Sequence, residues 1–95
     1  MAQHYKTLLL SIIQKHFPDA RVYLFGSRAR GDARSGSDVD LALDIGKKIE
    51  LRALFALKDD IDESEVPVFV DVVDLQRAMG EFREQILKYG VLWKS

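Results

Sequence analysis

The stretch VYLFGSRARGDARSGSDVDLALD, residues 22–44, decides the fold, because two strand-like runs in it enclose a segment rich in turn-forming residues. Its first run, Val22–Phe25, is short, apolar and partly β-branched or aromatic, which predicts a buried strand that leads directly into Gly26. The second run, Asp38–Asp44, alternates strictly, so Val39, Leu41 and Leu43 share one face of a strand. The opposite face carries Asp38, Asp40, Ala42 and Asp44. The intervening glycines, serines and arginines predict a turn, a short helix and a loop.

Amphipathic helices are predicted before and after this stretch. Apolar residues recur at helical spacing from about Gln3 to Phe17, and Pro18 ends that helix. A second helix is predicted from about Glu50 to Asp62. Its expected inner side consists of Leu51, Leu54, Phe55, Lys58 and Ile61.

The last third of the chain predicts one more strand and further helix. Val66–Val73 is the third strand, and Leu75–Tyr89 forms one or more helices that Gly90 ends as a C-cap. Val91–Trp93 is too apolar for a free tail, so we expect it to dock on the core or on a partner. This alternation of strands and helices predicts an α/β (α+β) sheet covered by helices, and the short first connection argues against a purely parallel sheet.

Bulk properties narrow the function. The chain has 95 residues, so we expect a single domain over residues 1–95. A net charge of −1 argues against sequence-independent nucleic-acid binding, which needs many basic residues. The absence of cysteine excludes disulfides and thiol chemistry. There is neither a long apolar run nor a signal-peptide pattern, so we expect a cytoplasmic protein without a membrane span.

Gly26 and Ser27 follow directly on the first strand. A glycine there lets the backbone approach a ligand closely, and the Ser27 hydroxyl could donate to a phosphate oxygen. Arg28 and Arg30 lie nearby in the sequence and could neutralise phosphate charge, as could Arg34. The alternative is that Ser27 only caps a short helix.

Asp38 and Asp40 lie on the same face of one predicted strand, roughly 7 Å apart by strand rise. Two carboxylates so close repel one another unless a cation lies between them, and Mg²⁺ prefers such oxygen ligands together with substrate phosphates. The alternative is a solvated strand edge with acidic residues that discourage aggregation.

Asp71 favours the metal hypothesis, because it interrupts the most apolar run of the chain, residues 69–73. A carboxylate in such a run is costly unless it faces a functional edge, and a third acid makes a two-metal site plausible. Asp74 is excluded from the site because it can cap the following helix. Asp44 shares the acidic face but lies further along, and its inclusion stays open.

Other conspicuous residues receive structural interpretations. His16 has no paired metal-ligand spacing and is expected to be structural or exposed. Tyr89 and Trp93 are expected to be core or interface anchors rather than a platform for stacking a base. None of these three enters the predicted site.

The combination of Phe25-Gly26-Ser27-Arg28-Ala29-Arg30-Gly31 with Asp38-Val39-Asp40 resembles the motif of the polymerase-beta-like nucleotidyltransferases, in the form found in the minimal nucleotidyltransferases. Asp71 matches the third acid of that family. The resemblance covers nearly the whole chain. It implies the nucleotidyltransferase fold, with a three-stranded mixed sheet flanked by about four helices.

The resemblance also implies a reaction. Gly26 and Ser27 would hold the triphosphate of ATP, Asp38 and Asp40 would ligate Mg²⁺, and Asp71 would complete the site and help to activate the attacking hydroxyl. Two Mg²⁺ ions are expected. A hydroxyl would attack the α-phosphorus, take the nucleoside monophosphate and release pyrophosphate.

Minimal nucleotidyltransferases resemble one half of a two-gene module whose other half is a helical HEPN-domain protein, often a ribonuclease toxin. The resemblance therefore implies an antitoxin that adenylylates a tyrosine of this partner, in a hetero-oligomer or with further self-association. Two alternatives stay open. The chain could be a binding module without turnover, or the catalytic subunit of a two-subunit enzyme that modifies a small molecule.

Overall fold

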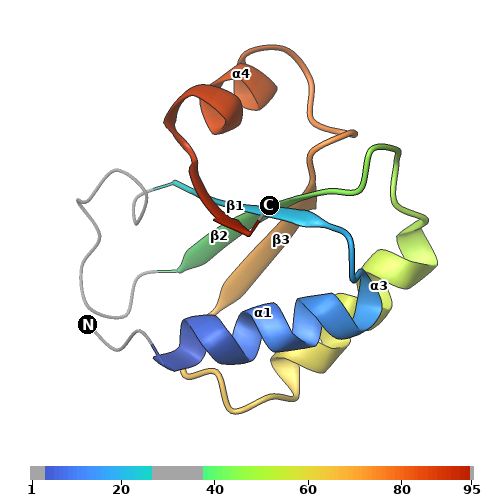
Figure 1. Ribbon diagram of the computed structural model, residues 1–95, viewed down its shortest axis with the longest axis vertical. Helices are drawn as coiled ribbons and strands as arrows, with labels where there is room; N and C mark the ends of the chain where they lie inside the picture. Colours follow the sequence, from blue (N-terminus) through green and yellow to red (C-terminus); the bar gives the residue numbers. More distant parts are fainter. Residues whose placement is uncertain (1–3, 27–37, 95) are drawn as a thin grey trace.

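Four strands form one sheet in the computed structural model, which describes residues 4–26 and 38–94 (Figure 1). In chain order the elements are α1 (His4–His16), β1 (Arg21–Phe25), β2 (Val39–Asp44), α3 (Leu51–Asp62), β3 (Val70–Asp74), α4 (Gly80–Tyr89) and β4 (Val91–Lys94). The short helix predicted after Gly26 falls outside the described residues. In the part of the chain that is described, no helix is long and apolar enough to cross a membrane.

The strands are ordered β3-β2-β1-β4 across the sheet. β1 pairs antiparallel with both β2 and β4, whereas β2 and β3 are parallel and are joined through α3. The predicted mixed α+β architecture is thus confirmed, but the sheet has four strands rather than three. The additional strand is β4, the apolar segment that the sequence predicted only to dock on the core or on a partner.

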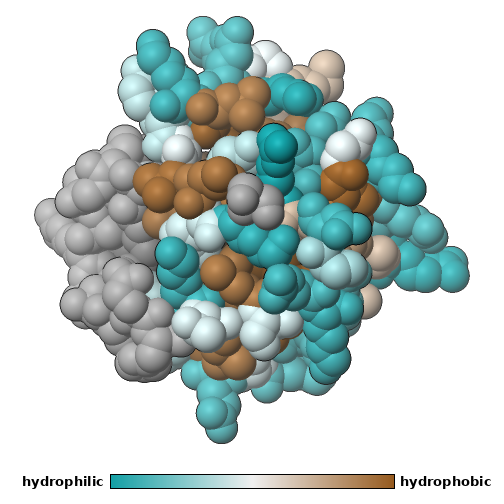
Figure 2. Space-filling view, in the orientation of Figure 1, coloured by the Kyte–Doolittle hydropathy of each residue, from teal (hydrophilic) through white to brown (hydrophobic). Residues whose placement is uncertain are grey.

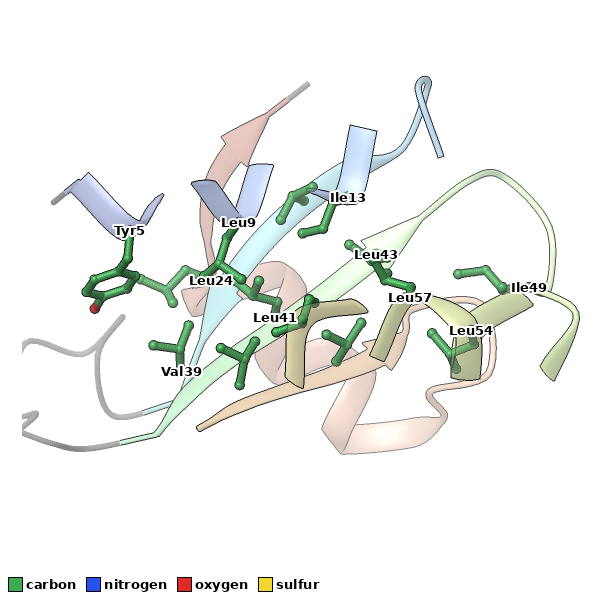
Figure 3. Packing of buried hydrophobic residues seen from close by; sticks show 14 residues of the cluster. Tyr5, Leu9, Ile13, Leu24, Val39, Leu41, Leu43, Ile49, Leu54 and Leu57 are labelled. Carbon is green, nitrogen blue, oxygen red and sulfur yellow. The ribbon is translucent and has the colours of Figure 1, made fainter. Parts of the chain in front are cut away.

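The first face of the sheet is buried under α1 and α3 (Figures 1 and 3). Val39, Leu41 and Leu43 are fully buried there, which confirms the alternation predicted for β2. The helices contribute Leu9, Ile13, Leu54, Leu57 and Ile61 to this core. Leu51 and Phe55, expected on the inner side of α3, are instead 48% and 55% exposed. Leu54, Leu57 and Ile61 are the buried residues of α3, and they form a narrow stripe that faces the core.

The second face is covered in its middle by α4. Ala42 of β2 is fully buried there, together with Leu75 and with Ile86 of α4. The face that the sequence showed as acidic therefore has an apolar centre. Its acids lie at the two ends of β2, with Asp40 at one end and Asp44 at the other.

Asp74 fixes the connections at the C-terminal ends of the strands. Its side chain is buried and accepts hydrogen bonds from the backbone N–H of Ile49 (2.7 Å) and of Gln76 (3.0 Å). Arg77 lies 3.4 Å from the same carboxylate and donates to the Ile49 carbonyl. Asp74 thus caps a turn over residues 75–77, not a helix, and α4 begins only at Gly80.

His16 and Asp60 connect the two helices of the first face, with a hydrogen bond of 2.7 Å between the imidazole Nε2 and the carboxylate. This bond is the main reason why the pKa of Asp60 lies below its ordinary value, and the nearby Lys15 charge acts in the same direction. The prediction that His16 is structural agrees with this contact.

Replacing the buried acid, Asp74→Ala, should lower the free energy of unfolding by about 2–4 kcal/mol, because it leaves buried N–H groups without their charged acceptor. Denaturant unfolding followed by circular dichroism measures this loss. Asp71→Ala removes an exposed carboxylate from the same strand and is the matched control. Equal stability of the two variants would contradict the role assigned to Asp74.

Asp60→Asn should remove an acid-sensitive part of the stability. Because the pKa of Asp60 is depressed in the folded state, its stabilisation is present above the unfolded value of 3.8 and disappears as pH falls through the folded value. Melting temperatures of wild type and Asp60→Asn should thus differ near neutral pH and converge in acid. Asp62→Asn, on the same helix, is the control that leaves the bond to His16 intact. A difference that persists unchanged at low pH would refute the linkage.

Candidate active site

Phe25, Asp40 and Asp71 lie in a row across three neighbouring strands. Asp40 is the register partner of Phe25 in β1 and of Asp71 in β3. Register partners share a face, and adjacent strands are separated by about 4.8 Å. Since Val39 and Val70 point into the core, the two carboxylates lie side by side on the opposite face. The structure thus brings together two of the three acids that the sequence assigned to the site.

Asp38 directly precedes β2 and is exposed. The backbone beside it still follows β3, because the N–H of Val39 donates to the carbonyl of Phe69 at 2.9 Å. Asp38 therefore lies at the end of the sheet where Asp40 and Asp71 also lie.

Gly26 directly follows β1 and adopts the left-handed region, with φ of +77°. A Cβ atom at this position would collide with the carboxylate oxygen of Asp40 and would lie 3.2 Å from its Cγ. Glycine is needed here for two reasons, the backbone conformation and the room that it leaves for Asp40. The sequence predicted a glycine for close approach to a ligand, and the structure adds its close approach to a site carboxylate.

Ser27, Arg28 and Arg30, the other predicted nucleotide-binding residues, lie outside the described residues, as does Arg34. Their contact with phosphate stays a prediction. Gly26, the last described residue before them, lies beside Asp40.

The donor set at Asp40 and Asp71 fits a hard cation that is shared with a substrate. Among residues 4–26 and 38–94, no three acidic, histidine or cysteine side chains form a group that could hold a metal ion alone. Mg²⁺ does not require such a cage, because it is commonly bound through one or two carboxylates together with substrate phosphates and water. Two carboxylates on adjacent strands supply that number of protein ligands.

Asp44 has a structural role at the other end of β2. Its carboxylate accepts hydrogen bonds from the Gln76 side chain and the Gly46 N–H, both at 2.8 Å. These two bonds lower the pKa of Asp44, and the bond from Gln76 has the largest effect. Partial burial acts in the opposite direction but is outweighed. The structure therefore separates Asp44 from the acids of the site.

A pocket of about 290 Å³ lies beside the site, between the end of β1 and α4. Phe25, Gly26, Phe82 and Tyr89 are among its lining residues, and the rings of Phe25 and Phe82 meet edge to face at 5.7 Å. The sequence did not indicate this pocket. Tyr89, predicted to be a core or interface anchor, is 54% exposed, so it is not a core residue, and the interface role stays a prediction. The spacing of seven residues between Phe82 and Tyr89, two helical turns, is the signal that could have indicated a shared aromatic face.

Comparison with known proteins gives consistent matches. The family model described as "Polymerase beta, Nucleotidyltransferase" matches residues 8–95. The chain is 36% identical over 85 residues to a Haemophilus influenzae protein named "Probable protein adenylyltransferase MntA", and the match covers 90% of this chain and 75% of that protein.

Two solved structures share the fold. A chain in the crystal structure of a toxin–antitoxin with AMP-PNP superposes with a TM-score of 0.79 at 25% identity, covering 95% of this chain and 73% of that chain. A chain in the complex of the tri-AMPylated Shewanella oneidensis HEPN toxin with MNT antitoxin superposes with a TM-score of 0.76 at 24% identity. That match covers 100% of this chain and 74% of that chain, and it shows likeness of fold alone.

Gly26→Ala should impair both stability and the site, because the new methyl group displaces the Asp40 carboxylate. Gly46→Ala is a matched control, since Gly46 has a similar φ of +82° but open space around it. Both variants should lose about 1–2 kcal/mol from the backbone conformation. Only Gly26→Ala should also lose Mg²⁺-dependent nucleotide binding, because the Asp40 carboxylate has to move away from the new methyl group. Equal nucleotide affinity of the two variants in titration calorimetry would show that the Gly26–Asp40 approach is unimportant.

Proposed function

The chain belongs to the polymerase beta nucleotidyltransferase family, and we propose that it transfers the adenylyl group of ATP to a tyrosine hydroxyl on a helical HEPN-type partner protein, as an antitoxin. The observation that carries the proposal is the pair Asp40 and Asp71, held on adjacent strands beside Gly26. The Haemophilus relative, named as an adenylyltransferase of proteins, supports this acceptor class.

The order of Gly26, Asp40 and Asp71 across the sheet fits in-line displacement at the α-phosphorus of ATP. The hydroxyl oxygen attacks the α-phosphorus while the bond to the β-phosphate oxygen breaks, so the attacking and leaving groups lie on opposite sides. Gly26 lies on one side of Asp40 and Asp71 on the other. We therefore assign the pyrophosphate to the Gly26 side, with Ser27, Arg28 and Arg30 as its binding residues. The acceptor belongs to the Asp71 side, where Asp71 can take the hydroxyl proton.

Asp38 and Asp40 are proposed to hold Mg²⁺ together with the triphosphate, and Asp71 to complete the site for a second ion. Mg²⁺, when bound, offsets the negative charge that develops on the phosphate oxygens and the leaving pyrophosphate. The close pair of carboxylates supplies the negative charge that such ions need.

A protein partner also fits the surface. Large apolar side chains are exposed on and next to α4 and β4, and Figure 2 shows apolar patches over these elements. They include Met79, Leu87, Val91 and Leu92. Exposed apolar surface of this kind commonly marks an interface, and the solved relative described as a toxin–antitoxin with AMP-PNP combines a protein partner with an ATP analogue.

The double substitution Asp38→Asn with Asp40→Asn should reduce transfer at least about 100-fold while the fold persists, because it removes metal ligands and relieves like-charge repulsion. The assay combines the purified protein, α-labelled ATP, Mg²⁺ and the product of the neighbouring gene, and follows the label by gel and mass spectrometry. Asp44→Asn, which changes an acid of the same strand outside the site, is the matched control and should retain transfer.

Each outcome separates the functional classes. Label on a partner tyrosine that disappears in the double variant supports the proposal. A tight complex without label identifies a binding module. Label on a small molecule identifies the catalytic subunit of a two-subunit enzyme that modifies small molecules. Full transfer by the double variant would refute the metal assignment.

A further inference from the structure

We propose that Phe69 is the surface on which the aromatic ring of the acceptor tyrosine docks, and that it thereby selects a phenolic hydroxyl over an aliphatic one. This inference rests on the proposed function, because it names a residue that binds the acceptor at the same site. It makes the start of β3 the part of the chain that determines which hydroxyl is modified.

Phe69 directly precedes β3, and its backbone is held in the sheet. Its carbonyl accepts the Val39 N–H at 2.9 Å, and on either side Val68 and Val70 pack against the core of the first face. Because side chains alternate along an extended segment, the ring of Phe69 is directed to the opposite face, where Asp71 lies. The ring and the carboxylate proposed to take the hydroxyl proton thus share one face of one strand, roughly 7 Å apart by strand rise.

The ring of Phe69 is open to solvent beside the acids of the site. Phe69 is 62% exposed and belongs to neither hydrophobic cluster of the described residues, so it contributes little to the core. Single exposed apolar side chains are common on protein surfaces, and exposure alone therefore indicates no function. The position of Phe69 distinguishes it. Since Val39 pairs with Val70 in the parallel register, the preceding residues Asp38 and Phe69 also lie next to each other.

Phe69 lies on the acceptor side of the site. The strand order places Asp40 between Gly26 and Asp71, and the proposed in-line attack brings the hydroxyl from the Asp71 side. β3 is the outermost strand in the described part of the sheet, so no other described strand lies beyond Phe69. A protein acceptor can therefore approach at this edge without crossing the rest of the sheet.

This geometry favours an acceptor whose hydroxyl lies at the end of a flat apolar ring. In serine and threonine the hydroxyl is attached at Cβ, so the acceptor backbone itself would have to come close to Asp71. In tyrosine the ring can pack against Phe69 while the hydroxyl reaches the carboxylate. Aromatic rings attract one another beyond the area that they bury when their centroids are about 4.5–7 Å apart, which matches the rise between residues 69 and 71.

The contribution of Phe69 to the transfer is to orient the acceptor. Asp71 takes the proton of the phenolic hydroxyl, the oxygen forms a bond to the α-phosphorus, and the bond to the β-phosphate oxygen breaks to release pyrophosphate. Phe69 takes no part in these bond changes. It restricts the acceptor ring, so that the oxygen is in line with the leaving group for more of the time.

The first test uses the transfer assay with α-labelled ATP, Mg²⁺ and the product of the neighbouring gene, in which mass spectrometry locates the labelled tyrosine. Phe69→Ala should lower kcat/KM for this acceptor about 10- to 100-fold, the cost of removing one aromatic anchor from a contact. Phe69→Tyr keeps the ring and should transfer as wild type. Phe55→Ala is the matched control, because Phe55 is exposed to a similar degree, 55%, but lies on α3, which covers the other face. AMP-PNP binding in titration calorimetry should be equal in all four proteins.

A binding measurement then locates the contact. Phe69→Ala should bind the unmodified partner less tightly than wild type does in titration calorimetry. Both proteins should bind equally a partner in which the labelled tyrosine is replaced by alanine, because the ring that Phe69 contacts is gone.

The outcomes keep two failures apart. Wild-type kcat/KM in Phe69→Ala would refute the inference and leave the proposed function standing. Weaker binding by Phe69→Ala that persists with the alanine-bearing partner would also overturn it, because Phe69 would then contact another part of the partner. The proposed function fails on a separate result, namely wild-type protein that labels no tyrosine of the partner, and the inference would fall with it.

Discussion

The approach of the Gly26 backbone to the Asp40 carboxylate is the constraint on which the site depends. It places the end of β1 directly beside the carboxylate of Asp40, an acid of the predicted site. The same strand pairing that sets this approach buries Val39, Leu41 and Leu43 on the other face. A slip of one residue would move both sets of side chains to the wrong faces. The hydrophobic core therefore fixes the geometry of the polar site.

The two faces of the sheet serve different purposes. α1 and α3 cover the first face, whereas the ten-residue α4 covers only the centre of the second. Because α4 begins after the turn at residues 75–77, it lies against β1 and leaves Asp40 and Asp71 uncovered by its apolar stripe. Asp74 holds this turn and the loop before α3 together. A buried structural acid thus helps to set where α4 lies beside the site.

Local patterns in the sequence were sufficient to predict much of this arrangement. Strict alternation predicted the buried face of β2, and the acidic interruption of an apolar run singled out Asp71, which lies beside Asp40. β4 was missed because four residues carry too little periodicity, and its pairing with β1 links segments almost 70 residues apart. The pocket was missed for a related reason, since Phe25 and α4 meet only after the chain has folded. Contacts within an element are visible in a sequence, but those between distant elements depend on packing.

The acids at the C-terminal ends of β2 and β3 have structural roles. At the C-terminal ends, Asp44 and Asp74 accept hydrogen bonds from Gly46, Gln76 and Ile49, so their charges are stabilised by the protein itself.

At the N-terminal ends, Asp40 and Asp71 are register partners and lie side by side on one face. The flanking residues of β2 and β3 are buried on the other face and hold this register. The packing of the core thus determines that two acids of the predicted site lie side by side at this end of the sheet.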